Sequence, residues 1–359
     1  MSHPRTVAFD AARNTVVLID QRRLPHRFTF LRAKNYRATA EAIVNMTVRG
    51  AGAIGATAAY GLAQGAREFK GSRLGEFRRH TDLVFKTLRA ARPTAVDPVN
   101  AMNAVRAAMA ASRTVAGRQQ LALEAAEQFA EEDIAHCRAI GEVGAPLIGR
   151  GLRVLTHCNA GALAFVDIGS ATAPLYAAHA AGVKFIVFCS ETRPRGQGAA
   201  LTAWELSRAG IEHVIIADGA AGHLMQRGEI GLVITGSDRV LGHTGEVANK
   251  IGTYTHAVLA ARHGIPFYVA IPLSTLDWET KSGADIQIEE RDAAEVLNAN
   301  GPRGPVRTAN PGSVARNPAF DVTPPELITG IITPKGIIKP RELWRRRKWF
   351  NSYNDSLCH

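Results

Sequence analysis

The sequence has few cysteines, no long apolar run and no recognisable secretion signal. Its four cysteines are Cys137, Cys158, Cys189 and Cys358, with no CxxC pair and no metal-ligand spacing, which argues against a disulfide scaffold and a metal centre. No apolar run approaches the roughly 18 residues of a membrane helix, and the start MSHPRTVAFD lacks an apolar core. We therefore expect a soluble cytoplasmic protein with reduced thiols.

The sequence also lacks the fingerprints of two large classes of binding protein. No Gly-x-Gly-x-x-Gly follows the first apolar strand pattern of the carboxyl half, so that no dinucleotide cofactor is indicated. The net charge is +11, from 43 basic and 32 acidic residues, but the basic residues are scattered except at 345–348. Because no finger, RRM or aromatic-basic repeat accompanies them, a solvated basic surface or an anionic small substrate explains the charge better than nucleic acid.

Length and hydrophobic spacing predict two domains. A chain of 359 residues is too long for one small core. Over residues 1–150 the spacing is mostly helical, with one short strand at Thr15–Asp20. The predicted helices of this part are 34–46, 74–91, 99–111 and 119–148. We therefore expect a mostly helical amino-terminal domain with a small strand element.

From Gly151 onward, apolar strand patterns alternate with short helical patterns. The strand patterns are Leu152–Thr156, Lys184–Cys189, His213–Ala217, Leu232–Thr235 and Pro266–Ile271, and the helical ones are 174–181, 201–209, 222–227 and 250–263. Such alternation is typical of a doubly wound parallel sheet. The sequence thus predicts a Rossmann-like domain over residues 151–345, followed by a basic tail at 346–359.

Two further segments of the carboxyl half carry local signals. The stretch Asn298–Asn317 is rich in Gly, Pro and Asn, which predicts a loop or lid. Thr323 precedes two prolines and stands three residues before Glu326, a pattern that predicts a helix start with a capping box.

The stretch 231–254 organises the predicted site. A buried strand pattern ends just before Asp238 and Arg239, and Asn249 and Lys250 then open a helical pattern. In an open parallel sheet, ligands bind at the carboxyl ends of strands and at the amino ends of the following helices. An acid, an amide and an ammonium group are therefore expected where such a fold does chemistry. The simpler alternative is that Asp238 caps a turn and pairs with Arg239.

Other predicted strands also end in reactive groups. Cys158 follows the first strand, the segment Ser190–Gln197 follows the second, and Asp218 follows the third. Taken singly, Cys158 could be a buried small hydrophobe and His157 a satisfied core histidine. Their common placement at one sheet edge predicts a crevice with a thiol, two acids, an amide and several arginines, suited to acid/base chemistry on a phosphorylated metabolite.

A small-residue segment in the helical half could face an anion. Arg49, Gly50 and Ala51 precede an apolar helical pattern, and backbone N–H groups at a helix start together with an arginine fork suit a phosphate. The alternative is tight helix packing, which also needs small residues.

Together these segments resemble the methylthioribose-1-phosphate isomerase family, in the superfamily of the initiation-factor 2B regulatory subunits. The resemblance extends from about Ile19 to about Pro340. Its segments are 48–51, 92–96, 156–161, 191–194, 197–199, 247–254 and 317–327.

The resemblance implies an aldose-ketose isomerase that converts 5-methylthioribose 1-phosphate to 5-methylthioribulose 1-phosphate in methionine salvage. It implies no cofactor, no metal, a helical domain followed by a Rossmann-like domain, and a homodimer. It places the catalytic pair on Cys158 and Asp238. The substrate contacts that it implies are Arg49, Gly50, Ala51, Arg92, Gln197, Asn249 and Lys250, so that both halves of the chain would hold the phosphate.

The sequence departs from the family pattern around these residues. Ser237 stands where the family usually has Ala, Gly52 where it has Pro, and the segments 97–100, 244–246 and 298–317 also differ. The chemistry is therefore better supported than the identity of the sugar's 5-substituent. Isomerases of 5-deoxyribose 1-phosphate or ribose 1,5-bisphosphate remain alternatives, as does a non-catalytic regulatory subunit, although Cys158 and Asp238 together argue against the last.

Overall fold

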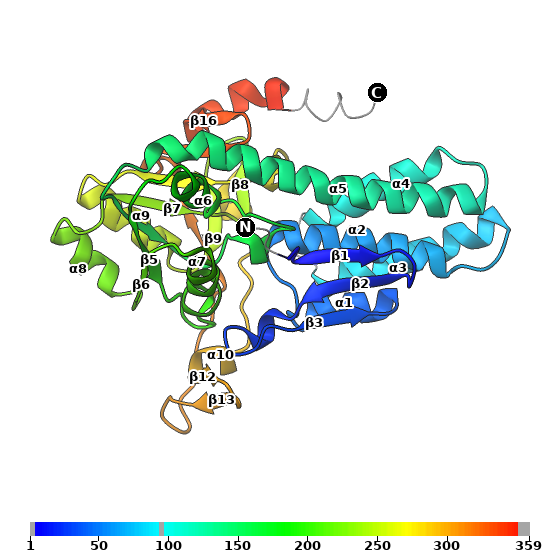
Figure 1. The fold of residues 1–359 in the computed structure, drawn as a ribbon, viewed down its shortest axis with the longest axis horizontal. Helices are drawn as coiled ribbons and strands as arrows, with labels where there is room; N and C mark the ends of the chain where they lie inside the picture. The colour runs from blue at the N-terminus through cyan, green and yellow to red at the C-terminus, as the bar shows by residue number, and fades with distance from the viewer. Residues whose placement is uncertain (1–3, 93–96, 351–359) are drawn as a thin grey trace. The chain divides into compact units, whose positions relative to one another are not determined.

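The computed structural model describes residues 4–92 and 97–350, which fall into two compact units (Figure 1). The first unit consists of residues 1–137 and 161–169, and the second of residues 138–160 and 170–359. The predicted motif positions 93–96 and most of the predicted tail, 351–359, lie outside the described residues. Within the part that is described, no helix is both long and apolar enough to cross a membrane.

The first unit combines a three-stranded antiparallel sheet with a set of helices. Its strands are β1 (Val7–Asp10), β2 (Thr15–Ile19) and β3 (Phe30–Ala33). Its helices are α1 (Tyr36–Val44), α2 (Ala51–Glu68), α3 (Leu74–Ala91), α4 (Asp97–Ala110) and, as far as Cys137, α5 (Val115–Gly144). The four predicted helices are confirmed with small shifts at their ends. The strands β1 and β3 were not predicted, because four residues are too few to show an alternating pattern.

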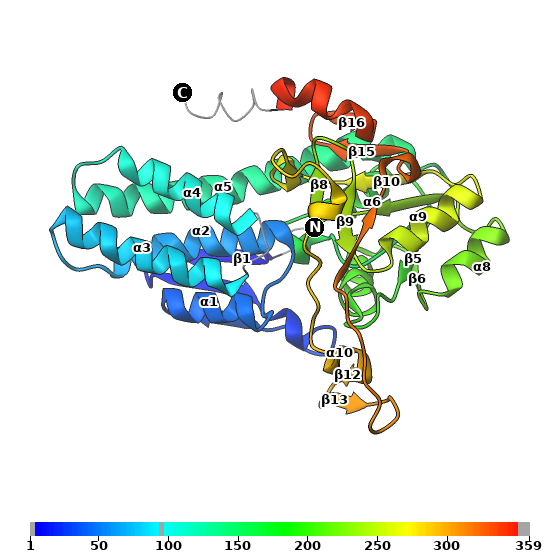
Figure 2. The ribbon, with the colours of Figure 1, turned by 180° about the vertical axis from the view of Figure 1, so that it is seen from behind.

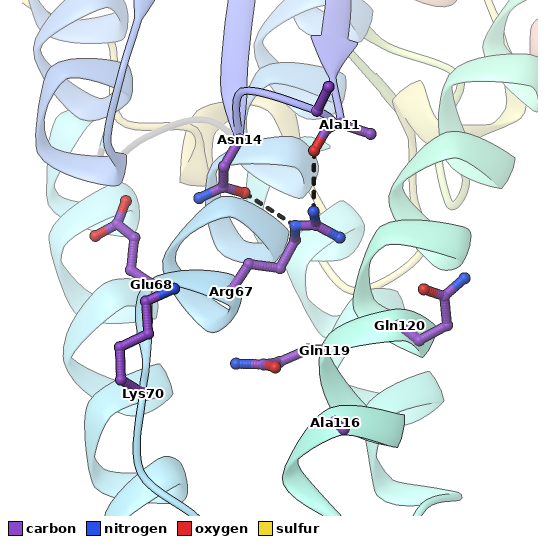
Figure 3. Close-up of a pocket in the computed structure, with 9 residues that line it drawn as sticks. Ala11, Asn14, Arg67, Glu68, Lys70, Ala116, Gln119 and Gln120 are labelled. Carbon is purple, nitrogen blue, oxygen red and sulfur yellow. Dashed lines mark hydrogen bonds between the residues drawn. The ribbon is translucent and has the colours of Figure 1, made fainter.

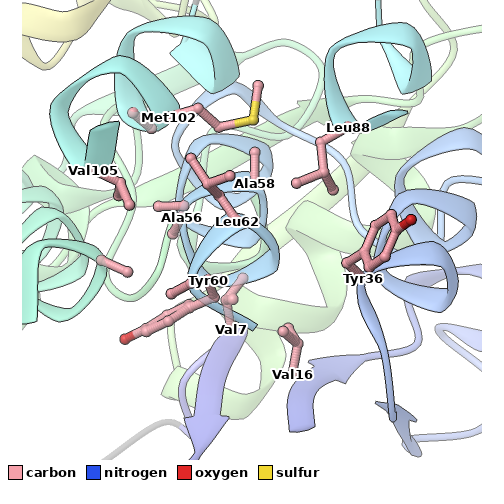
Figure 4. Packing of buried hydrophobic residues seen from close by; sticks show 14 of the residues in the cluster. Val7, Val16, Tyr36, Ala56, Ala58, Tyr60, Leu62, Leu88, Met102 and Val105 are labelled. Atoms are coloured by element: carbon pink, nitrogen blue, oxygen red, sulfur yellow. The ribbon is translucent and has the colours of Figure 1, made fainter. Parts of the chain in front are cut away.

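Helix α2 forms the centre of this unit. It packs against α1, α3 and α4, and its Tyr60 and Leu62 are fully buried beside Leu88 and Met102 (Figure 4). The many alanines and glycines of α2 allow this close packing. A Cβ on Gly65, for example, would lie 2.6 Å from a methyl carbon of Val84.

The second unit is built on a seven-stranded sheet in the order β16-β15-β10-β7-β4-β5-β6. All neighbouring pairs are parallel except β15 and β16. The strands are β4 (Arg153–Thr156), β5 (Ile186–Ser190), β6 (His213–Ile216), β7 (Leu232–Thr235), β10 (Phe267–Ala270), β15 (Gly330–Thr333) and β16 (Gly336–Ile338). The predicted α/β class with a parallel sheet is confirmed, and the five predicted strands are all present.

The order of these strands reverses at β4. The chain goes from β4 to β5 and β6 on one side, and then returns to β7, β10 and β15 on the other. This is the order of a doubly wound sheet, in which ligands bind at the carboxyl ends of the two strands that flank the reversal. The helices between the strands are α6 (Ala173–Ala180), α7 (Ala203–Ala209), α8 (Ala220–Gln226) and α9 (Thr253–Arg262).

A second sheet in this unit corrects two predictions. Its order is β11-β8-β9-β14, with β11 at Leu276–Asp277, β8 at Arg239–Leu241, β9 at Val247–Lys250 and β14 at Phe320–Thr323. Asn249 and Lys250 therefore end a strand, and α9 begins only at Thr253 after Gly252, whose φ is +102°. Thr323 pairs opposite Val247 instead of capping a helix, because the antiparallel ladder with β9 keeps it extended. Only a 3-10 turn, Pro325–Leu327, follows it.

The segment predicted as a loop at 298–317 contains regular structure. The strands β12 (Asn298–Gly301) and β13 (Gly304–Arg307) form an antiparallel hairpin after the short helix α10 (Ala294–Leu297). The hairpin extends away from the seven-stranded sheet (Figure 2). The other short helical turns are 21–23, 145–147, 162–164, 273–275, 283–285, 340–342 and 344–346.

The described end of the chain packs on the second unit. Trp344 stacks on His243 with ring centroids 3.6 Å apart, and Phe350 is buried near Trp278. Part of the predicted basic tail therefore belongs to the core of this unit.

Asp133 makes the stability of the first unit depend on pH. Burial raises the pKa of its carboxyl from 3.8 to about 7; the backbone N–H of Val166 opposes this rise, and Asp97 and Asp167 add to it. The unfolded carboxyl ionises at lower pH than the folded one, so the free energy of unfolding should fall as the pH rises from about 4 to about 7.

We predict that Asp133→Asn removes this dependence, because an amide cannot ionise and still accepts the hydrogen bond from Val166. In urea unfolding, the free energy of unfolding of the variant should rise relative to that of the wild type between pH 4 and 7, by at most about 3 kcal/mol. Glu124→Gln, at an exposed carboxylate of α5, is the matched control. If the free energies of unfolding of variant and wild type differed by the same amount at pH 5 and pH 8, Asp133 would not be the source of the pH dependence.

Candidate functional site

The candidate site lies where the strand order of the large sheet reverses. Cys158 follows β4 by two residues, and Asp238 follows β7 by three. β4 and β7 are direct neighbours in the sheet, so that their carboxyl ends lead the chain into the same region. Both residues of the predicted catalytic pair therefore lie in the loops that directly follow the two strands at the reversal.

The backbone of Cys158 is held in a left-handed turn with φ +63°. Its N–H donates to Thr192 Oγ1 at 2.8 Å, and its C=O accepts from Thr202 Oγ1 at 2.7 Å. Thr202 ends a short π-helix at Gly198–Thr202, which begins directly after Gln197. The thiol-bearing residue is half-buried and is fixed by hydroxyl groups on both sides of its peptide.

Asp238 lies in the turn between the two sheets. Its backbone N–H donates to Ala248 O at 3.1 Å, which places it beside β9. The hydroxyl of Ser237 holds the same turn through bonds to the carbonyls of Arg239 and Ala248. Asp238 is exposed, and the guanidinium of Arg239 forms an ion pair with Asp277 at 3.2 Å.

The ammonium group of Lys250 interacts with both members of the predicted pair. It donates to Ala319 O at 2.7 Å and lies 4.5 Å from the ring centroid of Phe320. Burial lowers its pKa, and electrostatic interactions with Cys158 and Asp238 act in the opposite direction. Lys250 is therefore a cation close enough to the thiol and the carboxyl group to interact with both electrostatically.

Two buried amides accompany these groups. Asn249 donates from Nδ2 to Thr253 Oγ1 at 2.9 Å and so supports the start of α9. Gln197 is 7% exposed, and its Oε1 has no hydrogen-bond partner among the described residues. An unsatisfied buried acceptor costs about 1–3 kcal/mol, which is typical of a group that awaits a ligand or an ordered water.

The arginines expected in the crevice hold protein segments together. Arg193 donates to the carbonyls of Val296 and Asn298, and Arg195 pairs with Glu295 at 2.8 Å. Burial raises the pKa of Glu295, but hydrogen bonds from Arg291 and Arg195 outweigh it and lower the pKa to about 2. These contacts fasten α10 and β12 to the loop that follows β5.

Behind Cys158 lies a buried polar cluster of His157, Ser190, Asp218 and His256. One ring nitrogen each of His157 and His256 and an Asp218 oxygen lie within 4.8 Å of one another, which is close enough for metal ligands. The Ser190 hydroxyl, however, contacts all three, at 3.2 Å from each imidazole nitrogen and with a hydrogen bond to Asp218. Ser190 therefore links the three side chains, while His256 Nδ1 has no hydrogen-bond partner among the described residues.

The remaining predicted contacts belong to the first unit. Gly50 caps α2 with φ +93°, and a Cβ there would lie 2.4 Å from Ala164 Cα, so that glycine is required. Ala51 begins α2, and Arg49 donates to Gln21 Oε1 at 3.1 Å. Arg92 follows the last residue of α3. Their role in holding a phosphate stays a prediction.

A separate pocket of about 550 Å³ lies in the first unit near Arg67 (Figure 3). Arg67 donates there to Asn14 Oδ1 and Ala11 O, both at 3.0 Å. The lining contains none of the predicted site residues.

The fold and this polar site define a doubly wound α/β protein with a thiol, an acid and an ammonium group at the switch point. The sequence model of the Initiation factor 2 subunit family matches residues 47–340, and the chain belongs to this family. A methylthioribose-1-phosphate isomerase of Methylorubrum populi is 48% identical over 351 residues, 94% of each chain. The resemblance to these isomerases drawn from the sequence is thereby confirmed.

Two solved structures extend the comparison. The 5-methylthioribose 1-phosphate isomerase of Pyrococcus horikoshii is 40% identical with a TM-score of 0.88, over 98% of this chain and 97% of that one. A structure described as translation initiation factor eIF-2B, subunit delta, from A. fulgidus is 39% identical with a TM-score of 0.84, over 97% and 100%.

The residues that hold the site together have no distinctive pattern in the sequence. Thr192 and Thr202 bond the peptide of Cys158, and Asp218, expected as a second acid of the crevice, instead accepts backbone N–H groups. Threonines are too common to be singled out by pattern. The one available signal was their place in the polar segments that follow β5.

Proposed function

We propose that this protein isomerises 5-methylthioribose 1-phosphate to 5-methylthioribulose 1-phosphate, a step of methionine salvage. The observation that carries the proposal is the placement of Cys158 and Asp238 directly after β4 and β7, the neighbouring strands at which the order of a doubly wound sheet reverses. Support comes from the relative in Methylorubrum populi, which is named for this activity and matches 94% of the chain.

The substrate explains why a thiol and an acid are needed. Its phosphate blocks the anomeric oxygen, so the ring C–O bond must break while the phosphate stays attached. Asp238 protonates the ring oxygen and later accepts the proton of the C2 hydroxyl, so that its own charge is restored. One hydrogen moves from C2 to C1, which leaves a ketone at C2.

Cys158 serves the transfer between C2 and C1. In one route its thiolate takes the C2 proton and returns it to C1; in the other the hydrogen passes directly as a hydride while the sulfur stabilises the electron-poor carbon. Deuterium at C2 distinguishes the two routes, because exchange with solvent requires the thiolate route. Neither needs an external electron carrier, since the sugar is both oxidised and reduced.

Charged and amide groups would hold the substrate. Lys250 can bind the phosphate or a developing oxyanion, and the unpartnered Oε1 of Gln197 can accept from a sugar hydroxyl. We further propose that Asn249, Arg49, Gly50, Ala51 and Arg92 contribute contacts, as the resemblance implies. The proposed location is the cytoplasm, where cysteines such as Cys137 and Cys189 would stay reduced.

The main alternative is a regulatory subunit without activity. The structure from A. fulgidus is described as an initiation-factor subunit, with 39% identity to this chain. The joint presence of Cys158 and Asp238 after neighbouring strands favours the enzyme, because a binding protein has no need for a thiol and an acid at that place.

We propose that the protein is a homodimer that uses the edge strand β6. Within the described residues β6 pairs only with β5, and its Val214 and Ile215 are 45% and 50% exposed. Successive strand residues point to opposite faces, so the edge is apolar on both. An exposed edge strand presents unpaired N–H and C=O groups on which the edge of a second copy can pair.

The catalytic proposal predicts that Asp238→Asn abolishes turnover but keeps substrate binding. The amide preserves the shape of the carboxyl group and cannot transfer the proton. Ketose formation should fall by at least about 10³-fold, while the Kd from calorimetry changes little. Asp285→Asn, at an exposed acid of the same unit, serves as the control. Normal turnover in Asp238→Asn would rule out the acid/base role, and loss of binding would assign Asp238 to positioning.

The dimer proposal predicts that Val214→Lys combined with Ile215→Lys yields a monomer, because two buried ammonium groups cannot be solvated in the interface. Sedimentation velocity should give a dimer for the wild type and for Val306→Lys, whose side chain is 62% exposed on the hairpin. A double variant that still sediments as a dimer would show that β6 is not the interface.

A further inference from the structure

We propose that Thr192, fixed in place by Asp218, is a positioning residue that sets the backbone of Cys158. The inference rests on the proposed role of Cys158 in the reaction, and adds the residues that act through it.

The conformation of Cys158 needs an external restraint. Its φ of +63° lies in the left-handed region that non-glycine residues rarely adopt, and such residues persist where surrounding contacts over-determine them. Here the contacts are the two hydroxyl bonds to its N–H and C=O, from Thr192 and Thr202. Both threonines are buried, so that bulk water does not compete for these bonds.

Thr192 is itself restrained in an unusual conformation. It has φ +65°, which is rarer still for a β-branched residue. Its N–H donates to Asp218 Oδ1 and the next N–H, that of Arg193, donates to Oδ2, both at 2.7 Å. One carboxylate thus closes the turn at two successive peptides.

The proton of the Thr192 hydroxyl has a defined direction. Thr192 Oγ1 donates to Ser190 O at 2.9 Å, the nearer of its two acceptors, since His157 Nδ1 lies 3.4 Å away. Its lone pairs therefore face the N–H of Cys158 at 2.8 Å. Thr192 Oγ1 therefore accepts the hydrogen bond from Cys158. Serine at this position can also accept it, whereas valine cannot.

The cluster behind Asp218 keeps this carboxylate charged. Burial raises the pKa of Asp218. Hydrogen bonds from Ser190, Arg193 and Thr192 lower this pKa by more than burial raises it, so that it lies below its ordinary value. Burial lowers the pKa of His157 and brings that of His256 to about 3. Both imidazoles are thus neutral at neutral pH.

The tautomers of the two histidines follow from the same contacts. His157 Nε2 donates to Ile251 O at 2.9 Å, so its Nδ1 accepts from His256 Nε2 at 3.2 Å. With the Ser190 hydroxyl donating to Asp218, the atoms that face one another are all used in bonds, and only the far nitrogen of His256, Nδ1, has no partner among the described residues. The cluster is thus a scaffold that holds the turn at Thr192.

The test compares Thr192→Val with Thr192→Ser. Valine keeps the shape and removes the acceptor, so kcat should fall by about 10- to 100-fold with KM within about twofold of the wild type. Serine should restore kcat to within about threefold. Thr81→Val, which removes a buried hydroxyl bonded only to its own helix, should leave kcat unchanged.

A second readout does not need turnover. The rate at which iodoacetamide alkylates Cys158, followed by peptide mass spectrometry, should change severalfold in Thr192→Val and return toward the wild-type rate in Thr192→Ser. If Thr192→Val does not fold, Asp218→Asn takes its place, with a lowered kcat and an unchanged KM expected.

The proposal is overturned if Thr192→Val keeps kcat within twofold and alkylates normally, or if the serine variant is as impaired as the valine variant. Cys158→Ser, assayed alongside, separates the two claims. Full turnover in Cys158→Ser would refute the role of the thiol, whereas an inactive Cys158→Ser with an active Thr192→Val would refute only the positioning by Thr192.

Discussion

The site depends on one topological constraint, the reversal of strand order at β4. The chain fills one side of the sheet with β5 and β6 and then returns to place β7 on the other side of β4. At such a point the loops that follow the two strands diverge, and a ligand can enter between them. Cys158 and Asp238 lie in those two loops. Backbone hydrogen bonding between β4 and β7 therefore brings into one region two residues that are 80 positions apart in the sequence.

The second sheet gives this site its charge. The antiparallel pairing of β9 with β8 and β14 carries Lys250 to the same region, where the chain turns from β9 into α9. Burial disfavours the ammonium ion, and interactions with Cys158 and Asp238 offset part of that cost. A cation near a thiol and an acid suits a reaction in which charge appears on a sugar oxygen and must be neutralised.

The sequence predicts the large sheet well and the second sheet poorly, for a physical reason. The strands of the large sheet are continuous apolar runs, such as Leu232–Thr235, because a parallel sheet is buried on both faces. The strand VANK at Val247–Lys250 has no such apolar run. Its residues also fit the helical spacing of α9, which begins three residues later, so the sequence predicts a helix from Asn249. Its extended form is imposed by pairing with Phe320–Thr323, some 70 residues later.

The same limit applies to the site. Residue types at strand ends identify Cys158 and Asp238, because the position of a strand end can be inferred from sequence. The contacts that fix them cannot be inferred, since Thr192, Thr202 and Asp218 matter only through turns with unusual φ angles and bonds that cross the fold. At Thr323 the local sequence is that of a helix start, but the strand pairing with Val247 determines the structure and keeps Thr323 extended.

The most direct test of the account is a substrate panel. Purified protein and its Cys158→Ser variant are incubated with 5-methylthioribose 1-phosphate, 5-deoxyribose 1-phosphate and ribose 1,5-bisphosphate, and ketose formation is measured. The account predicts that the wild type has its highest kcat/KM with 5-methylthioribose 1-phosphate, and that Cys158→Ser forms no ketose from any of the three. Absence of ketose from all three with the folded wild type would contradict it.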